Sequence, residues 1–316
     1  MKIISHEIIQ GLHISPADCY QWVEEMIQNK ENAILPPKIS MKPSDGVFCN
    51  VMPTIVSYPN GEAYGGVKIV TRYPERVPTL DAKLLLQDSK SGKFLALMDA
   101  NWITTMRTGA VAAHSILLFA KTNFSVIGMI GLGNTAIATL LTLITVRPEL
   151  CLHIKLLRYK GQEELFAARF AEYKNLTFEY FDRAEEVIKG AHVVVSAATY
   201  LPGDLCSDDC FDEGVLVVPV HTLGFTNCDL FFDKVYADDR GHVCHFKNFD
   251  KFKRFAEVHD VVCGNAAGRT SDKERILAYN IGIAMHDINF AAHIYSMIPK
   301  SLPEIDLKEP TTKTYI

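Results

Sequence analysis

The spacing of apolar residues changes along the chain, and each change indicates a different kind of secondary structure. Near the N-terminus five apolar residues recur at helical spacing: Cys19, Trp22, Val23, Met26 and Ile27. Ser15 and Pro16 stand where an N-cap and a first-turn proline belong, with Asp18 in the first turn. The pattern predicts an amphipathic helix whose apolar face packs into the core.

Between residues 47 and 98 the pattern becomes one of short strands. Four apolar stretches are separated by turn residues: Val47–Val56, Ala63–Thr71, Ala82–Gln87 and Phe94–Met98. Because no helix intervenes, we expect an antiparallel sheet. A helix over Asn101–Lys121 follows. Its small residues around Gly109 suit either a close ligand or plain helix–helix packing.

In the next part of the chain strands and helices alternate. Strands are expected at Ser125–Ile130, Leu152–Leu157, Leu176–Tyr180, His192–Ser196 and Val215–Val220. Helices are expected after Gly133, over Glu163–Tyr173 and from a capping box at Asp182–Glu185. Such alternation favours a doubly wound parallel sheet. A second capping box, Ser271–Glu274, predicts a long final helix through Ile276 to Ile288 that packs back on the first part.

The two patterns predict an α/β protein with two domains. A Rossmann-type dinucleotide-binding domain takes residues 119–275. A discontinuous α+β domain for substrate binding and dimerisation takes residues 1–118 and 276–316.

Composition narrows the possible partners. The chain has 316 residues, 48% of them hydrophobic and 22% charged, with a net charge of −5. No long basic run is present, so nucleic acid and anionic membrane surfaces are poor partners. No apolar run approaches a membrane span, and Lys2 and Glu7 interrupt any signal-peptide pattern. We therefore expect a cytoplasmic protein whose partner is a small molecule.

The eight cysteines form no CxxC pair and are expected to be reduced thiols. One group of metal-ligand residue types does occur in a single region: Cys206, Cys210, His242, Cys244 and His245. Their spacing fits no zinc motif, so we expect no metal site.

A glycine turn follows the strand Ser125–Ile130. Gly131 would permit the tight turn, and Gly133 would let the backbone approach a pyrophosphate. Ala136 would keep the next helix close to the strand. Asn134 and Thr135 open that helix, whose free N–H groups suit phosphate. The alternative is an α/β turn that binds no ligand.

Two further strand ends bear on the cofactor. The strand 152–157 is followed by Arg158 and Lys160 and by no acidic residue, which favours the 2′-phosphate of NADP(H), with NAD(H) as the alternative. Ala197 and His221 follow the strands 192–196 and 215–220, so we expect both at the nucleotide cleft.

Several spaced blocks together resemble the ornithine cyclodeaminase/mu-crystallin family. They are Pro36-Pro37-Lys38, Gly65-Gly66-Val67-Lys68, Leu86-Gln-Asp88, Ala96-Leu-Met98-Asp99, Thr104-Thr-Met-Arg107-Thr108-Gly109-Ala110, the Gly131–Gly133 turn, Gly268-Arg269-Thr270-Ser271 and Gly282-Ile-Ala284 with Asp287. The resemblance covers about Leu35 to Tyr295. It implies a homodimer that binds NAD(H) or NADP(H) and transfers hydride between nicotinamide and an α-amino or α-imino acid.

The resemblance also implies roles for single residues. Lys68 and Arg107 would hold the substrate carboxylate, and Thr108 would approach the cofactor together with Arg107. Lys38 stands where the family has an arginine, so it keeps the charge but lacks the bidentate fork. The alternatives are an exposed edge lysine for Lys68 and a surface ion pair for Arg107.

One position departs from the family pattern. Ornithine cyclodeaminases have an acid–base aspartate where this chain has Thr226, whose hydroxyl does not titrate near neutral pH. Asp229 and His221 are the other acid–base candidates, and a histidine packed at the sheet end is an equal alternative for His221. This departure counts against cyclodeamination but leaves hydride transfer open. A nucleotide-dependent binding protein with little turnover, similar to mu-crystallin, is the rival hypothesis.

Overall fold

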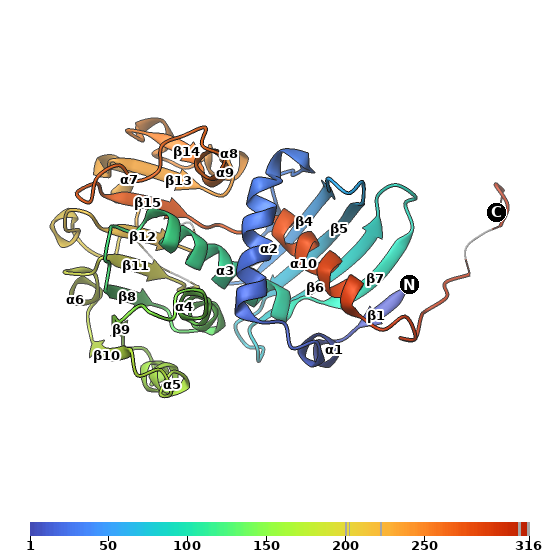
Figure 1. Ribbon diagram of the computed structural model, residues 1–316, viewed down its shortest axis with the longest axis horizontal. Helices are drawn as coiled ribbons and strands as arrows, with labels where there is room; N and C mark the ends of the chain where they lie inside the picture. Colours follow the sequence, from blue (N-terminus) through green and yellow to red (C-terminus); the bar gives the residue numbers. More distant parts are fainter. Residues whose placement is uncertain (200, 202, 222, 309–310, 315–316) are drawn as a thin grey trace.

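The computed structural model describes residues 1–316 except 200, 202, 222, 309–310 and 315–316. Within these residues the chain forms two sheets, each with its own helices, joined through α2 and α3 (Figure 1). The predicted fold class is confirmed: an α/β domain with a parallel sheet stands beside an α+β domain.

The first sheet has seven strands in the order β1-β7-β6-β5-β4-β2, with β3 also paired to β4. Their bounds are β1 Lys2–Ile4, β2 Ala33–Ile34, β3 Ile39–Met41, β4 Phe48–Ser57, β5 Ala63–Arg72, β6 Leu80–Asp88 and β7 Phe94–Asp99. The pairs from β4 to β7 are antiparallel, as expected from their short connections, whereas β1 pairs with β7 in parallel.

Helices cover one face of this sheet. They are α3 Asn101–Phe119 and α10 Ala284–Met297, which contact the strands; α2 Pro16–Gln28 packs against both of these helices, while α1 His6–Gly11 lies beside β1 and contacts α3. The predicted start of α2 is confirmed, because Ser15 Oγ accepts from Asp18 N at 3.1 Å and Asp18 Oδ2 accepts from Ser15 N at 2.9 Å. Short 3₁₀ turns η1 Lys30–Asn32, η2 Asp208–Cys210 and η3 Phe249–Lys251 complete the helical segments.

The second sheet has eight parallel strands in the order β10-β9-β8-β11-β12-β15-β13-β14. Their bounds are β8 Val126–Ile130, β9 Leu152–Leu157, β10 Leu176–Phe181, β11 Val193–Ser196, β12 Leu216–Pro219, β13 Lys234–Ala237, β14 Phe255–Glu257 and β15 Ile276–Tyr279. The helices of this domain are α4 Asn134–Val146, α5 Gln162–Arg169, α6 Ala184–Ile188, α7 Cys228–Phe231, α8 Arg240–Val243 and α9 Val258–Val262.

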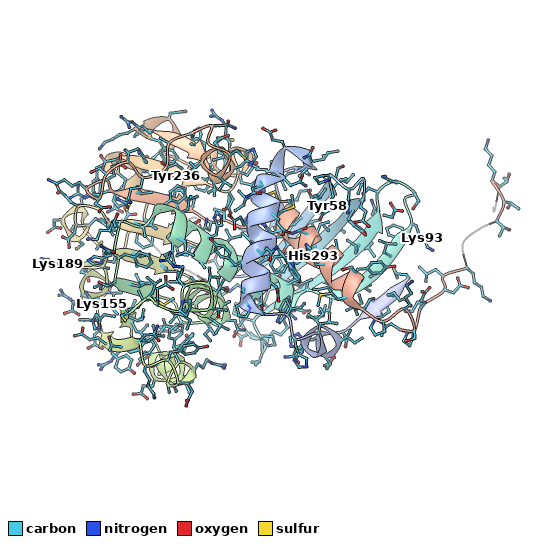
Figure 2. The ribbon with its side chains drawn as sticks, viewed as in Figure 1. Tyr58, Lys93, Lys155, Lys189, Tyr236 and His293 are labelled. Atoms are coloured by element: carbon cyan, nitrogen blue, oxygen red, sulfur yellow. The ribbon has the colours of Figure 1, made fainter. Side chains whose placement is uncertain are left out.

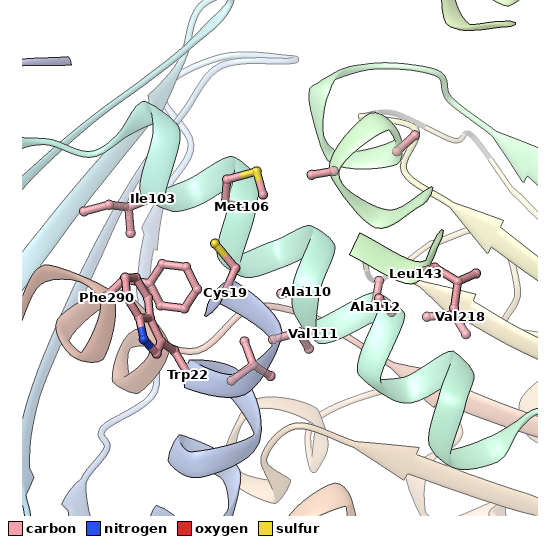
Figure 3. Close-up of a cluster of buried hydrophobic side chains, with 14 of the residues drawn as sticks. Cys19, Trp22, Ile103, Met106, Ala110, Val111, Ala112, Leu143, Val218 and Phe290 are labelled. Carbon is pink, nitrogen blue, oxygen red and sulfur yellow. The ribbon is translucent and has the colours of Figure 1, made fainter. Parts of the chain in front are cut away.

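Helix α3 belongs to the core of both domains (Figure 3). Ile103 at its beginning lies near Trp22 and Phe290, which belong to the first domain. Further along, Ala112 lies near Leu143 and Val218 of the second domain. One continuous helix therefore fixes the two sheets relative to each other.

The predicted final helix from residue 271 is wrong at its beginning. Residues 276–279 form β15, all four are buried, and α10 begins only at Ala284. In an apolar run that is buried on both faces, hydrophobic and polar residues do not alternate, so the sequence pattern cannot distinguish a strand from a helix. Gly282, at φ +76°, adopts a left-handed conformation between the two elements. Since β15 pairs with β12 and β13, the expected domain boundary at 275/276 falls just before a strand of the parallel sheet.

Three smaller expectations also need correction. The Asp182–Glu185 capping box does not form, because Arg183 is the N-cap of α6 and Asp182 pairs with Arg158 instead. The helix expected to run to residue 173 ends at Arg169. Strands β13 and β14, of four and three residues, were not predicted.

No helix in the described part of the chain is long and apolar enough to cross a membrane.

The contact between α3 and α4 leaves no room for a side chain at Gly109. A Cβ there would lie 2.4 Å from Ala138 Cβ and 2.7 Å from Thr139 N. We expect Gly109→Ala to lower the free energy of unfolding by about 2–3 kcal/mol, because the helices must separate. Urea denaturation measures this loss. Gly11→Ala is the control, since nothing lies within 4 Å of its Cβ; equal losses in both variants would contradict the prediction.

Candidate active site

Three buried charged side chains from different elements meet at the junction of the two domains. Lys68 of β5 donates from Nζ to Asp287 Oδ1 at 2.7 Å, and Arg107 of α3 donates from Nε to the same oxygen at 3.0 Å. Asp287 belongs to α10. Lys68 and Asp287 are 0% exposed and Arg107 is 5% exposed. The structure thus brings together the two cations expected to hold a substrate carboxylate.

The pleat of β5 decides where Lys68 points. Lys68 pairs with Met52 of β4 and Leu84 of β6, and both of these residues are buried on the helix-covered face of the sheet. Its chain neighbours Val67 and Ile69 point to the other face, where Ile69 is 43% exposed. The interpretation of Lys68 as an exposed edge residue is therefore wrong.

Arg107 is held against the backbone of the second domain's last loop. A Cβ at Gly282 would lie 2.5 Å and 3.0 Å from its two terminal guanidinium nitrogens, so glycine is required there. Within the described residues those terminal nitrogens have no hydrogen-bond acceptor, although Nε is paired. The guanidinium therefore presents two unused donors in the fork geometry that matches a carboxylate.

Lys38 reaches the same region from the segment before β3. Its Nζ donates to Ile281 O at 2.9 Å, next to Gly282. Asp238, at the end of β13, accepts from Gly282 N at 3.1 Å and from Asn280 Nδ2 at 3.1 Å. Lys38 thus adds a third cation to the cluster. Asp238, bonded to Gly282 N, adds a second buried carboxylate.

Burial and the crowding of cations alter the acidity of these groups. Burial, and then the charges of Arg107 and Lys38, lower the pKa of Lys68 to about 7. Burial and the charge of Arg107 lower the pKa of Lys38 to about 8. Burial alone would raise the pKa of Asp287, but Arg107 and Lys68 together lower it. Burial raises the pKa of Asp238. The cluster therefore combines three basic side chains, Lys38, Lys68 and Arg107, with two acidic ones, Asp238 and Asp287.

The glycine turn after β8 has the geometry of a dinucleotide site. Gly131, at φ +78°, lies so close to the next strand end that a Cβ would be 2.4 Å from Ala198 N and 2.7 Å from the carbonyl carbon of Ala197. Gly133 has nothing within 4 Å of its Cβ position, so this side of the turn is open. Asn134 is exposed and Thr135 half-buried, and no side chain caps the start of α4. The free N–H groups of α4 therefore face open space.

Two residues next to Arg107 are engaged within the protein. Thr108 Oγ1 donates to Thr104 O at 2.6 Å along the same helix. Gly109 packs against Ala138 and Thr139, so the helix-packing interpretation explains this glycine.

Arg158 and Lys160 follow β9, as expected for an adenosine-ribose site. The side chain of Arg158 is 49% exposed, 3.4 Å from Asp182, and lies over the ring of Tyr180. Lys160, at φ +53°, lies over the ring of Tyr159. Both cations remain accessible to an anion.

The two acid–base candidates of the second domain make contacts away from Lys68 and Arg107. His221 Nε2 lies 2.6 Å from Ser196 Oγ, and its Nδ1 accepts from Leu223 N at 3.3 Å. Burial lowers the pKa of His221 to about 4. Asp229 is 1% exposed and accepts from Tyr279 Oη at 2.9 Å, and burial raises its pKa to about 6.

Thr226 uses its hydroxyl within its own loop. Its Oγ1 donates to Asp204 Oδ1 at 2.7 Å, and Asn227 N donates to the same oxygen at 3.3 Å. The Thr226 hydroxyl is thus engaged with a carboxylate of its own loop, and a threonine hydroxyl does not titrate near neutral pH.

Sequence reasoning missed the role of Asp287, although the residue was part of the family resemblance. A carboxylate inside the apolar run Ile283–Ile288 was the available signal, because aspartate is rarely buried without a partner. Asp238 and Gly282 gave no comparable signal, since their partners are distant in the sequence.

A sizeable cavity lies away from the cation cluster. A cavity of about 630 Å³ lies between α2, α10 and the β4–β5 turn, and Tyr58 and His293 line it (Figure 2). Its residues carry no part of the chemistry above. Among the described residues no group of three or more His, Cys, Asp or Glu is placed to hold a metal ion.

Comparisons with known proteins agree with this geometry. The sequence matches the ornithine cyclodeaminase/mu-crystallin family over residues 3–301. The nodulation efficiency protein NfeD of Rhizobium meliloti is 27% identical over 94% of this chain and 95% of its own. The N-((2S)-2-amino-2-carboxyethyl)-L-glutamate dehydrogenase of Staphylococcus aureus is 26% identical over 83% of each chain.

Solved structures show the same fold. The Δ(1)-pyrroline-2-carboxylate reductase of Thermococcus litoralis, in complex with NADH and L-proline, has a TM-score of 0.82 at 22% identity, covering 94% of this chain and 97% of the other. An archaeal alanine dehydrogenase dimer with bound NAD has a TM-score of 0.78 at 23% identity, covering 94% and 95%. The chain belongs to the ornithine cyclodeaminase/mu-crystallin family.

Proposed function

We propose that this protein is an NAD(P)-dependent oxidoreductase acting on an α-amino acid or its imine. The single observation that carries the proposal is the Arg107 guanidinium, buried beside Lys68 with two donors unused within the described residues. A carboxylate accepts such a pair of donors in a bidentate bond. The names of the relatives, a dehydrogenase of an amino-acid derivative among them, support the same substrate class.

The charge balance of the cluster favours a monoanionic group. Lys38, Lys68 and Arg107 supply three cations, and Asp287 and Asp238 supply two carboxylates. Burial raises the pKa of Asp238, and the hydrogen bonds from Gly282 and Asn280 and the charge of Arg107 oppose that rise. One further negative charge would complete the balance, because an unmatched buried charge is costly. A neutral imine lacks that charge and would bind more weakly.

The residues around the glycine turn fit a nicotinamide dinucleotide. Gly133 leaves the turn open, and α4 presents its free N–H groups to a pyrophosphate. When bound, the cofactor supplies or accepts the hydride. The chain's own task is orientation: Arg107 and Lys68 fix the carboxylate, so the adjoining α-carbon is presented to the cleft. Positioning of this kind contributes several kcal/mol to catalysis.

Lys68 also suits the proton transfer at the substrate nitrogen. Its lowered pKa of about 7 lets the ammonium lose a proton near neutral pH, and burial keeps it out of water. His221 is a weaker candidate because its Nε2 is engaged with Ser196. Asp229 is 1% exposed and accepts a hydrogen bond from Tyr279, so we assign it a supporting role within the second domain.

We assign NADP(H) as the preferred cofactor. Arg158 and Lys160 offer accessible positive charge at the end of β9, where a 2′-phosphate would lie. The Arg158–Asp182 pair is exposed and 3.4 Å long, so breaking it for a phosphate costs little.

We further propose that two copies pair through the first sheet. A row of apolar side chains crosses its outer face in register: Ile3, Leu97, Leu85, Val67 and Pro53. The helices contact the opposite face, and an apolar sheet face of this width needs a cover. A symmetric copy of the same face would supply it.

Replacing Arg107 tests the carboxylate role. We expect Arg107→Ala to lower kcat/KM for an imino acid by about 100-fold or more, because two charge-assisted hydrogen bonds are lost. Arg107→Lys should recover only part of the activity, since it keeps the charge without the fork. Oxidation of NADPH with a panel of cyclic imines and 2-oxoacid–amine mixtures provides the assay. If the unaltered protein binds the cofactor but oxidises no NADPH with any member of this panel, the result would favour a binding protein instead.

Cofactor preference is tested by titration of NADPH and NADH. We expect NADPH to bind more tightly than NADH. The double change Arg158→Ala and Lys160→Ala should lower the affinity for NADPH by about tenfold and leave the affinity for NADH unchanged. Lys174→Ala removes an exposed cation elsewhere and serves as the control. Tighter binding of NADH by the unaltered protein would overturn the assignment.

The proposed dimer is tested by light scattering after size-exclusion chromatography. We expect Leu97→Asp to weaken dimerisation by about 100-fold, because a carboxylate would be buried in the apolar row. Leu165→Asp, at a residue 70% exposed on α5, should leave the mass unchanged. A monomeric unaltered protein, or a dimeric Leu97→Asp variant, would count against this interface.

A further inference from the structure

A histidine of the second domain holds the backbone of the segment that carries Lys38. Lys38 N donates to His242 Nε2 at 3.3 Å, and His242 Nδ1 lies 2.8 Å from Asp239 Oδ1. His242 belongs to α8 and is 5% exposed. Lys38 belongs to the first domain, so this hydrogen bond crosses the junction between the domains.

The directions of these two hydrogen bonds fix the state of the imidazole. The backbone N–H of Lys38 can only donate, so His242 Nε2 must carry a lone pair. The ring proton therefore sits on Nδ1 and is donated to Asp239. A neutral histidine in this one tautomer satisfies both partners, and the aspartate enforces it.

Asp239 is itself firmly placed. Lys30 Nζ contacts Asp239 Oδ2 at 3.0 Å and Glu257 Oε2 at 2.6 Å, and it donates to Asp238 O at 3.0 Å. Burial alone would raise the pKa of Asp239. The hydrogen bond from His242 and the charge of Lys30 outweigh this effect and lower the pKa to about 2. The carboxylate is therefore charged and keeps its place next to His242.

Lys38 depends on this support more than an arginine would. Among the described residues its ammonium makes one hydrogen bond, to Ile281 O, and it lacks a fork that would orient it on a carboxylate. A hydrogen bond that fixes the Lys38 backbone therefore fixes the point from which its flexible side chain reaches the cluster. Pro37, immediately before it, lies 3.8 Å from the position of a Cβ at Gly241 of α8.

We propose that His242, oriented by Asp239, is a positioning residue that holds Lys38 at the substrate-carboxylate site. This inference rests on the proposed role of Lys38 as a carboxylate clamp. His242 would act through its hydrogen bond to the Lys38 backbone, so its loss should weaken substrate binding more than it slows the chemical step.

The kinetic test compares two replacements of His242. His242→Leu fills a similar volume without an acceptor, and we expect KM to rise about tenfold with kcat within about twofold. His242→Gln can place its amide oxygen near the position of Nε2 and should restore KM to within about threefold of the original. Asp239→Asn, which no longer enforces the tautomer, should also raise KM. An unchanged KM in His242→Leu, or equal loss in both His242 variants, would overturn the proposal.

A second readout does not depend on turnover. In the full-length protein, with and without NADP, competitive acetylation followed by mass spectrometry measures the reactivity of the Lys38 amine. We expect Lys38 to react several-fold faster in His242→Leu than in the unaltered protein or in His242→Gln, with Lys174 as the internal reference. Equal Lys38 reactivity in all three proteins would refute the positioning role. If no protein oxidises NADPH, the proposed function fails, and this measurement still decides whether His242 positions Lys38.

Discussion

The structure depends on one carboxylate that could not be buried alone. Asp287 lies within an apolar helix and is fully shielded from water, a position that costs several kcal/mol without a cation. Lys68 and Arg107 face the same penalty, and all three avoid it only by meeting. Because they come from β5, α3 and α10, their pairing ties the sheet to both of its covering helices. The pairing is unequal, however: one carboxylate oxygen serves two cations, so positive charge is left over. This excess of cations at a buried point is the reason why we propose the cluster as a receptor for an acid.

The position of that receptor relative to the nucleotide turn follows from one helix contact. Arg107 and Gly109 are two residues apart on α3, and Gly109 lies directly on Ala138 and Thr139 of α4. Helix α4 begins at the glycine turn. The guanidinium and the phosphate-binding turn are thus connected through two packed helices with no flexible loop between them. A substrate held by Arg107 and a nucleotide held at α4 would therefore keep a fixed separation, which hydride transfer requires.

Local features of the fold were predictable from the sequence, and long-range pairings were not. The α2 cap at Ser15 and the turn at Gly131 were recognised because residue type and backbone geometry coincide over a few positions. Strand β15 was mistaken for helix because Ile276–Tyr279 is buried on both faces and shows no period. Lys68 and Arg107 were found through the family resemblance. Their shared partner Asp287, and the contact of His242 with Lys38, join residues more than 170 positions apart, and no local pattern records such contacts.

The loop around Thr226 limits what the cation cluster can be used for. Ring closure with loss of ammonia needs a group that exchanges protons repeatedly beside the substrate, and Thr226 donates its hydroxyl to Asp204 instead. Asp229, the nearest alternative along the chain, is held by Tyr279 in a second hydrophobic cluster. Reduction of an imino acid makes a smaller demand, because one proton must reach one nitrogen. Lys68 can meet that demand, since its pKa is lowered to about 7 by the same crowding of charge that attracts the carboxylate. Under the proposed function Lys68 would serve both as carboxylate clamp and as proton donor, which favours simple hydride transfer over cyclodeamination.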